Sequence, residues 1–317
     1  MSAKNNLLDG FLARRIHSLL GVVPIGIFMI IHLTTNSSVV WGALNSRANA
    51  DTPIGRGVKT FQHEVDFINN LPLLLLTEIF VLWVPIGLHA ILGVYYATSG
   101  KSNVSHYSYQ SSWRYSLQRL TAWLGLLFVV YHVATLRWGW TFLIPGDAQW
   151  SHYFASSTLA AAMKGSADGW TIAGIIVSVG YFVGVMALVF HLANGLWTAA
   201  ITWGLTVTEK AQKRWGAVCT VLGLGLAGAG ASAIFGFLFL ADYEDAHHIE
   251  SGMVIEKYGE DYYLELLEKY DIPINPETGE LETGTTNNEQ VFQDAVREAA
   301  NRAYPGPPKP LAESNDG

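Results

Sequence analysis

Five long apolar stretches dominate the sequence and limit the folds that it can adopt. Each is nearly free of charged side chains and is long enough to cross the roughly 30 Å hydrocarbon core of a bilayer as a helix. The sequence therefore predicts an all-α integral membrane protein, a five-helix bundle. The fourth stretch is longer than a crossing needs and should tilt or project from the bilayer. The expected helices are Leu19–Val40, Leu71–Thr98, Leu117–Trp138, Trp170–Thr206 and Trp215–Leu240.

The last part of the chain has a different character. From Asp242 onward there are 18 acidic and 5 basic residues, whereas the preceding part has 8 acidic and 14 basic residues. This shift predicts a five-helix membrane domain at 1–241 and an acidic, mostly irregular C-terminal extension at 242–317. Within the extension, short helices are expected at Asp261–Tyr270 and Glu289–Ala303.

Lysine and arginine are distributed unequally between the two sides of the expected bundle. Outside the acidic extension, nine of them flank the side that carries the N-terminus and five flank the other. Because loops rich in these residues stay in the cytoplasm, the bias orients the multi-pass protein in its membrane, which is expected to be the bacterial inner membrane. Its N-terminus would be cytoplasmic and its C-terminus outside.

The single cysteine, Cys219, excludes a disulfide within the chain, a cysteine-ligated iron–sulfur cluster and a c-type haem attachment. Histidine is left for metal chemistry. Four of the ten histidines fall inside the expected helices, one in each of the first four: His32, His89, His132 and His191. Each alone could be a neutral histidine bonded to a nearby carbonyl. Since ionisable residues within membranes are rare and usually functional, four of them on four helices indicate a shared role.

The depths of these histidines sort them into two layers. Counted from the cytoplasmic end, His32 and His132 lie about 16 and 15 residues in, roughly 24 and 22 Å. His89 lies about 9 residues in, roughly 14 Å, and His191 falls nearer the cytoplasm once the excess length of its helix is discounted. Two stacked pairs suit two b haems, each held by histidines from two helices. Zinc would favour a tighter cluster of three or four ligands, and a copper site or a proton relay stays open.

Four local motifs carry these histidines: "RRIHSLLGVVPIGIFMIIHL" at 14–33, "LHAILGVYYA" at 88–97, "LQRLTAWLGLLFVVYHV" at 117–133 and "FHLANGLWTA" at 190–199. Over residues 10 to 240 the chain closely resembles the single-chain, five-helix, dihaem cytochrome b subunit that anchors succinate dehydrogenases and fumarate reductases. The resemblance implies two b haems, the distal one on His32 and His132 and the proximal one on His89 and His191. It also implies an FAD-containing flavoprotein subunit and an iron–sulfur subunit on the cytoplasmic side. The second substrate would be a quinone, usually menaquinone, near the distal haem.

Two carboxylates are candidates for proton transfer at a quinone site. Glu64 lies in "HEVDFI", whose surroundings resemble the segment that carries the quinone-site glutamate of dihaem fumarate reductases. Glu78 lies 11 residues before His89, roughly 16 Å towards the outer face. The competing interpretations are a solvated loop carboxylate for Glu64 and a protonated or paired structural acid for Glu78. His63 is a weaker candidate for the same role.

Haem propionates need cations or hydroxyl groups near the membrane surface. On the inner side the candidates for such contacts are Arg14, Arg15, His17, Ser18, Arg119 and Lys210. They could equally be the ordinary positive flank of a membrane protein. His17 is expected at the interface and not as an iron ligand.

One residue departs from the family pattern. Val189 stands where some dihaem fumarate reductases carry a glutamate implicated in transmembrane proton transfer, so that route is not expected here.

The expected function is electron transfer between the iron–sulfur subunit and quinone through two b haems, in succinate oxidation or in fumarate reduction. Two alternatives stay open: the haem b subunit of a hydrogenase or formate dehydrogenase, and a haem-free transporter or anchor.

Overall fold

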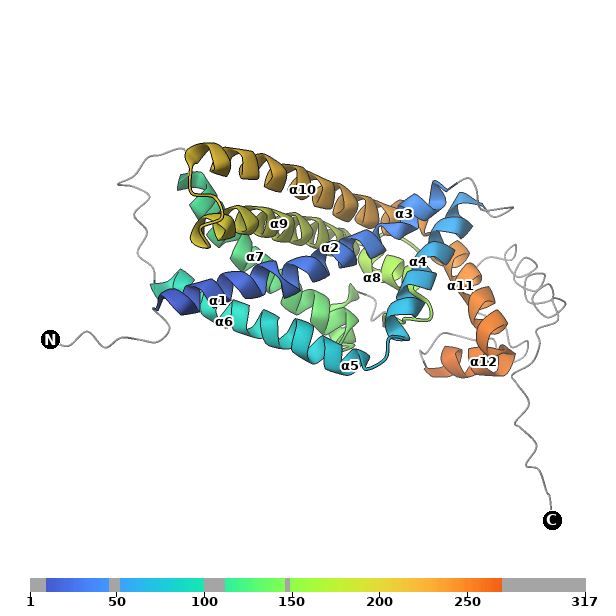
Figure 1. The fold of residues 1–317 in the computed structure, drawn as a ribbon. Helices are drawn as coiled ribbons and strands as arrows, with labels where there is room; N and C mark the ends of the chain where they lie inside the picture. The colour runs from blue at the N-terminus through green and yellow to red at the C-terminus, as the bar shows by residue number, and fades with distance from the viewer. Residues whose placement is uncertain (1–9, 46–51, 100–111, 146–148, 270–317) are drawn as a thin grey trace, which may run out of the picture.

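The computed structural model describes residues 10–45, 52–99, 112–145 and 149–269. Every regular element among them is a helix. Figure 1 shows a bundle of long helices with a group of shorter helices packed at the end away from the N-terminus. The expected all-α fold is confirmed.

Five helical segments are long and apolar enough to cross a membrane, which confirms the expected number. Two are unbroken: α7 at Ser112–Leu136 and α9 at Ile172–Thr202. The first joins α1 (Phe11–Val22), α2 (Pro24–Asn36) and α3 (Ser38–Ala43). The second joins α5 (Leu74–Thr77), the π-helix η2 (Glu78–Trp83) and α6 (Val84–Ser99). The fifth joins α10 (Glu209–Phe235) and the π-helix η5 (Gly236–Leu240).

Local chemistry explains where these helices begin and break. Pro24 has no backbone N–H, so it tolerates only the first turn of a helix, and α2 starts there after a break at Val23. Thr171 and Thr208 cap α9 and α10, their hydroxyl groups accepting hydrogen bonds from the N–H of Gly174 and Ala211 at 3.0 and 3.2 Å.

Glycine allows the long helices to approach closely. A Cβ atom at Gly184 of α9 would lie 2.2 Å from the ring of Phe128 on α7, and one at Gly26 of α2 would lie 2.9 Å from Leu192 of α9. Lipid is as apolar as the helix side chains, so the hydrophobic effect does not hold the helices together within a membrane. Close packing of their backbones stabilises the bundle instead. Large apolar side chains such as Ile91, Leu127 and Ile176 point outward and are about two-thirds exposed, as expected of a surface that faces lipid.

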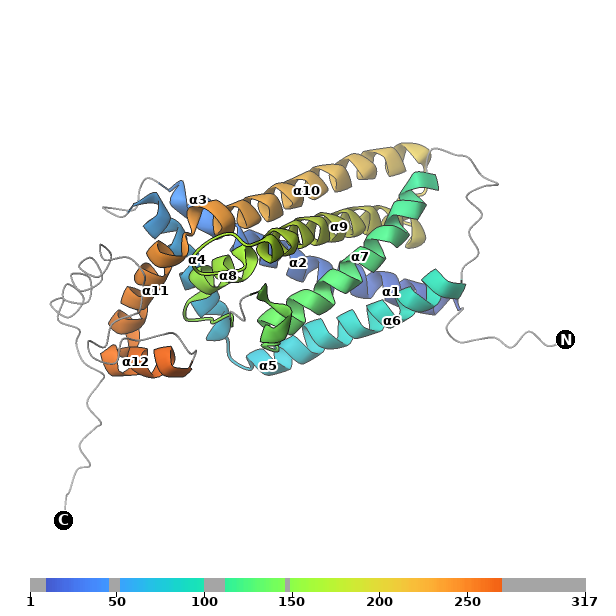
Figure 2. The same cartoon turned by 180° about the vertical axis from the view of Figure 1, so that it is seen from behind.

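Four shorter helices form a cap at the end of the bundle opposite the N-terminus (Figures 1 and 2). They are α4 (Pro53–Asn69), α8 (Ala155–Lys164), α11 (Tyr243–Tyr258) and α12 (Glu260–Lys269). We call the end that carries them the cap end and the other the N-terminal end. The cap and the bundle share one apolar cluster, in which Phe61 of α4 packs on Phe237 of η5 with ring centroids 4.9 Å apart.

Helix α8 is the centre of the cap, and all ten of its residues are buried. At the N-terminus of α8, the N–H groups of Ser156 and Ser157 donate hydrogen bonds to Glu250 of α11, at 2.5 and 3.2 Å. Lys164 at its C-terminus forms an ion pair with Asp242 at 3.3 Å. The carboxyl group thus accepts from N–H groups that the first turn leaves unpaired, and the cation at the last turn complements the helix dipole.

The described part of the C-terminal extension, up to Lys269, is helical and not irregular. The helix expected at Asp261–Tyr270 is confirmed as α12, whereas α11 was not predicted. Ala246 of α11 joins the apolar cluster of the bundle, because α11 packs on α4 and α8. The helix expected at Glu289–Ala303 lies outside the described residues.

Candidate functional site

The four intramembrane histidines come together as two pairs. His89 of α6 and His191 of α9 face each other towards the N-terminal end, with ring centroids 6.2 Å apart and planes at 86°. His32 of α2 and His132 of α7 form the second pair nearer the cap, with centroids 5.8 Å apart and planes at 81°. Imidazoles that share one metal ion at an N–metal distance of about 2 Å hold their centroids roughly 6 Å apart, so both pairs have the separation of a shared ligand set.

Backbone hydrogen bonds orient the first pair. The Nδ1 of His89 lies 2.9 Å from the carbonyl oxygen of His17 on α1, and the Nδ1 of His191 lies 3.2 Å from that of Gln118 on α7. A carbonyl can only accept, so each Nδ1 carries the proton and each Nε2 keeps its lone pair. Such bonds to the second nitrogen are the usual way in which a metal-binding histidine is positioned.

Polar residues near His191 reinforce this arrangement, and sequence reasoning missed them. Gln118 donates from Nε2 to the carbonyl of His191 at 3.1 Å, and its Oε1 accepts from Asn194 at 2.8 Å. The sequence did carry a signal for them, because Gln118 and Asn194 are amide residues within apolar helices, and polar side chains in lipid require hydrogen-bond partners.

The second pair has a different environment. The Nδ1 of His132 is buried and has no hydrogen-bond partner among the described residues. The Nε2 of His32 lies 3.4 Å from Nδ2 of Asn36, which donates a better bond to the carbonyl of His32 at 2.8 Å. The Nδ1 of His132 therefore lacks the backbone acceptor that orients the rings of the first pair, and the two pairs differ in how their rings are held.

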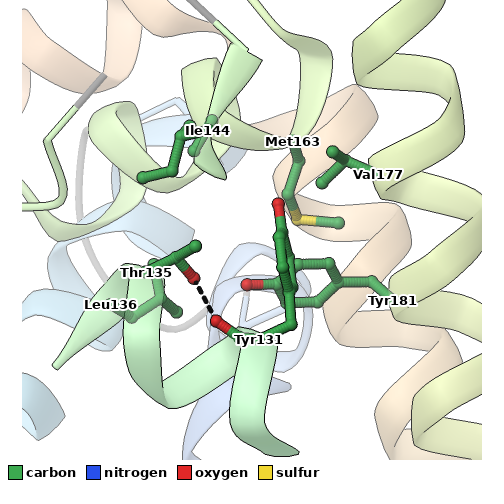
Figure 3. A pocket seen from close by; sticks show the side chains of 8 residues that line it. Tyr131, Thr135, Leu136, Ile144, Met163, Val177 and Tyr181 are labelled. Atoms are coloured by element: carbon green, nitrogen blue, oxygen red, sulfur yellow. Dashed lines mark hydrogen bonds between the residues drawn. The ribbon is translucent and has the colours of Figure 1, made fainter. Parts of the chain in front are cut away.

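A narrow space lies beside His132, between α7, α8 and α9. Tyr181 forms one wall next to Tyr131, with ring centroids 6.2 Å apart (Figure 3). The ring centroid of Tyr181 also lies 5.8 Å from that of His132. Thr135 and Met163 also line it, and it is too narrow for a water molecule. Residues of α8 therefore pack closely against α7 and α9 next to His132.

Whether these residues fit haem iron can be tested on their chemistry. Each pair offers imidazole nitrogens from two helices, and no group of three or more metal-ligating side chains occurs among the described residues, as a zinc centre would require. Gly21 of α1 contributes space: a Cβ atom there would lie 2.5 Å from Cε1 of His89. The donor set fits b-type haem.

His17 was expected at the membrane interface and not as an iron ligand, and the structure adds a contact with His89. It is half-buried, and its ring stacks on that of His89 with centroids 4.1 Å apart and planes at 9°. The contact arises because α1 packs its His17 turn against α6.

The two candidate carboxylates have different surroundings. Glu64 is half-buried on the helix α4, which does not fit the competing interpretation of a solvated loop carboxylate, and it makes no hydrogen bond or ion pair with another described residue. Glu78 begins η2 and forms a two-pronged ion pair with Arg137 at the end of α7, at 2.7 and 3.2 Å. His63 is exposed on α4.

The candidate propionate contacts gather at the N-terminal end, with different partners. Arg15 donates to the carbonyl of Thr202 at 3.2 Å, while its Nε is buried and unpaired within the described chain. Arg119 donates to the hydroxyl of Tyr115 at 2.6 Å and to the carbonyl of Ala97. The others are Arg14, which lies over the ring of Tyr96, half-buried Ser18 and exposed Lys210.

Comparison with known proteins places the chain in a family. It is 34 % identical over 232 residues to the succinate dehydrogenase cytochrome b558 subunit of Bacillus subtilis (strain 168), a match that covers 72 % of this chain and 97 % of that subunit. No family model and no solved structure matches the chain. The five membrane-spanning helices and this identity along nearly the whole relative lead to one conclusion: the chain belongs to the family of succinate dehydrogenase cytochrome b558 subunits, multi-pass membrane subunits of the succinate dehydrogenase complex.

Proposed function

We propose that this subunit holds two b haems and carries electrons between an iron–sulfur subunit and a quinone. His89 and His191 would bind the proximal haem, and His32 and His132 the distal one. The observation that carries the proposal is the presence of two separate imidazole pairs at ring distances of 6.2 and 5.8 Å. The cytochrome b name of the Bacillus subtilis relative supports it.

Bound haem iron supplies a one-electron carrier at each pair. The chain's own part is to hold the imidazoles in the neutral form that ligates iron. For His89 and His191 the acceptor carbonyls of His17 and Gln118 fix the proton on Nδ1. The apolar flanks of the spans exclude water, and Tyr181 closes the cap side of His132.

We infer that the N-terminal end faces the cytoplasm of a bacterial inner membrane and that the C-terminus lies outside. Arg14, Arg15, Arg114 and Arg119 support this orientation, because cations concentrate on the cytoplasmic side. The flavoprotein and iron–sulfur subunits would dock there, beneath His89 and His191. The propionates of the proximal haem would then contact some of the candidate residues at this end, which are Arg14, Arg15, His17, Ser18, Arg119 and Lys210.

The quinone, menaquinone in this proposal, would bind near the distal pair at the cap end. Reduction of a quinone requires a proton donor within hydrogen-bond reach. Glu64 and Glu78 are the candidates, since both lie in helices at that end and Glu64 has no partner among the described residues.

Four single substitutions test the haem assignment. His89→Ala or His191→Ala should remove one haem signal from the reduced-minus-oxidised spectrum of the purified complex, and His32→Ala or His132→Ala should remove the other. His63→Ala is the matched control, because it changes an exposed histidine outside the spans. Two unchanged haem signals in any of the four variants would refute the assignment.

A further inference from the structure

An open groove lies at the N-terminal end of the bundle, where the turn after α9 meets the start of α10. Its volume is about 390 Å³, and Thr206, Lys210, Arg214, Trp215 and Val218 are among its lining residues. Among its lining residues, Lys210 is also a candidate contact of the proximal haem's propionates. The proposed electron transfer uses none of the others.

The groove is positively charged. Lys210 and Arg214 are exposed and form no ion pair with another described residue, whereas Lys213 on the neighbouring face is paired with Glu209 at 2.7 Å. The groove also opens at the N-terminus of a 27-residue helix, whose dipole adds positive potential. An anionic group is therefore the ligand that its charge favours.

A buried hydroxyl points to the same kind of ligand. Thr206 is only 9 % exposed and lines the groove, and its Oγ1 is buried without a hydrogen-bond partner among the described residues. Both backbone groups of Thr206 have partners. Its carbonyl accepts a hydrogen bond from Nε2 of Gln212 at 3.2 Å, and its N–H donates to the carbonyl of Ala200. The side-chain hydroxyl is thus left for a group that enters the groove, and it would donate a hydrogen bond to a phosphate oxygen.

An apolar track continues from the groove along α10 towards the middle of the membrane. Val218, Val221 and Leu224 are 53, 71 and 69 % exposed, so they face lipid. Trp215 stands between the charged and apolar parts, and its Nε1 donates to the carbonyl of Leu196 at 3.1 Å, which fixes the indole. Cations, an interfacial tryptophan and an apolar track in this order match a phosphate head group with its acyl chains.

We propose that this groove binds an anionic glycerophospholipid. Its phosphate lies between Lys210 and Arg214 and accepts from Thr206, and an acyl chain follows Val218, Val221 and Leu224. A free phosphate would use the cations and leave the apolar track unused. The inference is independent of the haem assignment, because it rests only on the membrane location and on this groove.

The test uses the whole purified complex, delipidated in detergent and titrated with phosphatidylglycerol while native mass spectrometry counts bound lipid. Arg214→Gln and Lys210→Gln should each weaken binding about fivefold, the usual contribution of one cation near an anionic head group. Thr206→Val should weaken it by a similar factor without any change in charge. Lys213→Gln is the matched control on the same helix turn and should stay within about twofold of the unmodified complex.

Three results would overturn the proposal. The first is equal lipid retention in Arg214→Gln and the unmodified complex. The second is displacement of the lipid by inorganic phosphate at equal concentration, which would identify a free-anion site. The third is loss of the partner subunits from the Lys210 and Arg214 variants with unchanged lipid binding, which would identify a protein-docking surface. Phosphatidylcholine, which has no net charge, should bind the unmodified complex more weakly than phosphatidylglycerol does.

Discussion

His89 and His191 face each other with ring centroids 6.2 Å apart and nearly perpendicular planes, and each donates from Nδ1 to a backbone carbonyl of another helix. Four helices therefore converge on this pair, since α1 and α7 supply the acceptors for rings that α6 and α9 carry. The pair of His32 and His132 lacks this support, and the Nδ1 of His132 has no partner in the described chain. The two sites should differ in their response to changes in the surrounding backbone.

The close approach of α1 to His89 gives the first prediction. Because a Cβ atom at Gly21 would lie 2.5 Å from Cε1 of a ring that is already hydrogen-bonded, Gly21→Val should displace that ring. The variant should lose the haem signal of the His89 pair and keep that of the His132 pair. Gly87→Ala on α6 is the control, since a Cβ atom there meets nothing within 4 Å. Two intact signals in Gly21→Val would contradict the prediction.

The second prediction concerns proton transfer at the cap end. General acid–base groups typically contribute about 10²–10⁴-fold to a rate, so Glu64→Gln should lower quinone turnover at least 100-fold. Haem content and electron transfer to an artificial acceptor should not change. Glu256→Gln is a control on the exposed surface of α11 and should retain turnover. Loss of haem in Glu64→Gln would instead make this carboxylate structural.

Hydropathy was sufficient to predict the five spans, because lipid demands a continuous apolar helix wherever the chain crosses. The grouping of the four histidines followed from depth along those helices, and the structure brings the same residues into contact. The positions of the spans and the depths of the histidines follow from hydropathy and from the helical rise per residue, so they can be predicted without knowledge of side-chain packing.

The cap could not be predicted in this way. All ten residues of α8, "ASSTLAAAMK", are buried although four of them are polar, so the usual division of a helix into a buried apolar face and an exposed polar face does not describe it. Its ends are stabilised by Glu250 and Lys164 through contacts that span 94 and 78 residues. The pair of Glu78 and Arg137 likewise joins residues 59 apart, and it depends on the rotation of α7 relative to η2.

This ion pair gives the third prediction. Arg137 has a side chain that is 53 % exposed, so solvent and salt screen its attraction to Glu78. Glu78→Gln and Arg137→Gln should each lower the free energy of unfolding by less than about 1 kcal/mol, and the double variant by little more than one of them. Thermal unfolding of the purified complex at low and high salt measures this. Strictly additive effects would show that the two side chains do not interact.

The fourth prediction is a balance between Glu250 and His247 in the cap. Burial raises the pKa of Glu250 from 4.5 to about 7, despite hydrogen bonds from Ser156 and Ser157. The folded state therefore holds a proton that the unfolded state loses, and stability falls as the pH rises from about 4.5 to 7. Burial lowers the pKa of His247 from 6.5 to about 4. Unfolding then takes up a proton, so this residue raises stability as the pH rises from about 4 to 6.5.

The two contributions are each on the order of 3 kcal/mol and opposite in sign, so the native cap should respond little to pH between about 4.5 and 6.5. Glu250→Gln removes one of them, and the cap should then become more stable as the pH rises through this window. In His247→Gln the cap should instead become less stable as the pH rises. His248 is present in the unmodified protein and in both variants, so its titration does not distinguish them. Hydrogen exchange of the α8 and α11 amides, corrected for the intrinsic rate at each pH, measures this local stability. Identical pH responses in the three proteins would show that neither group changes its protonation on folding.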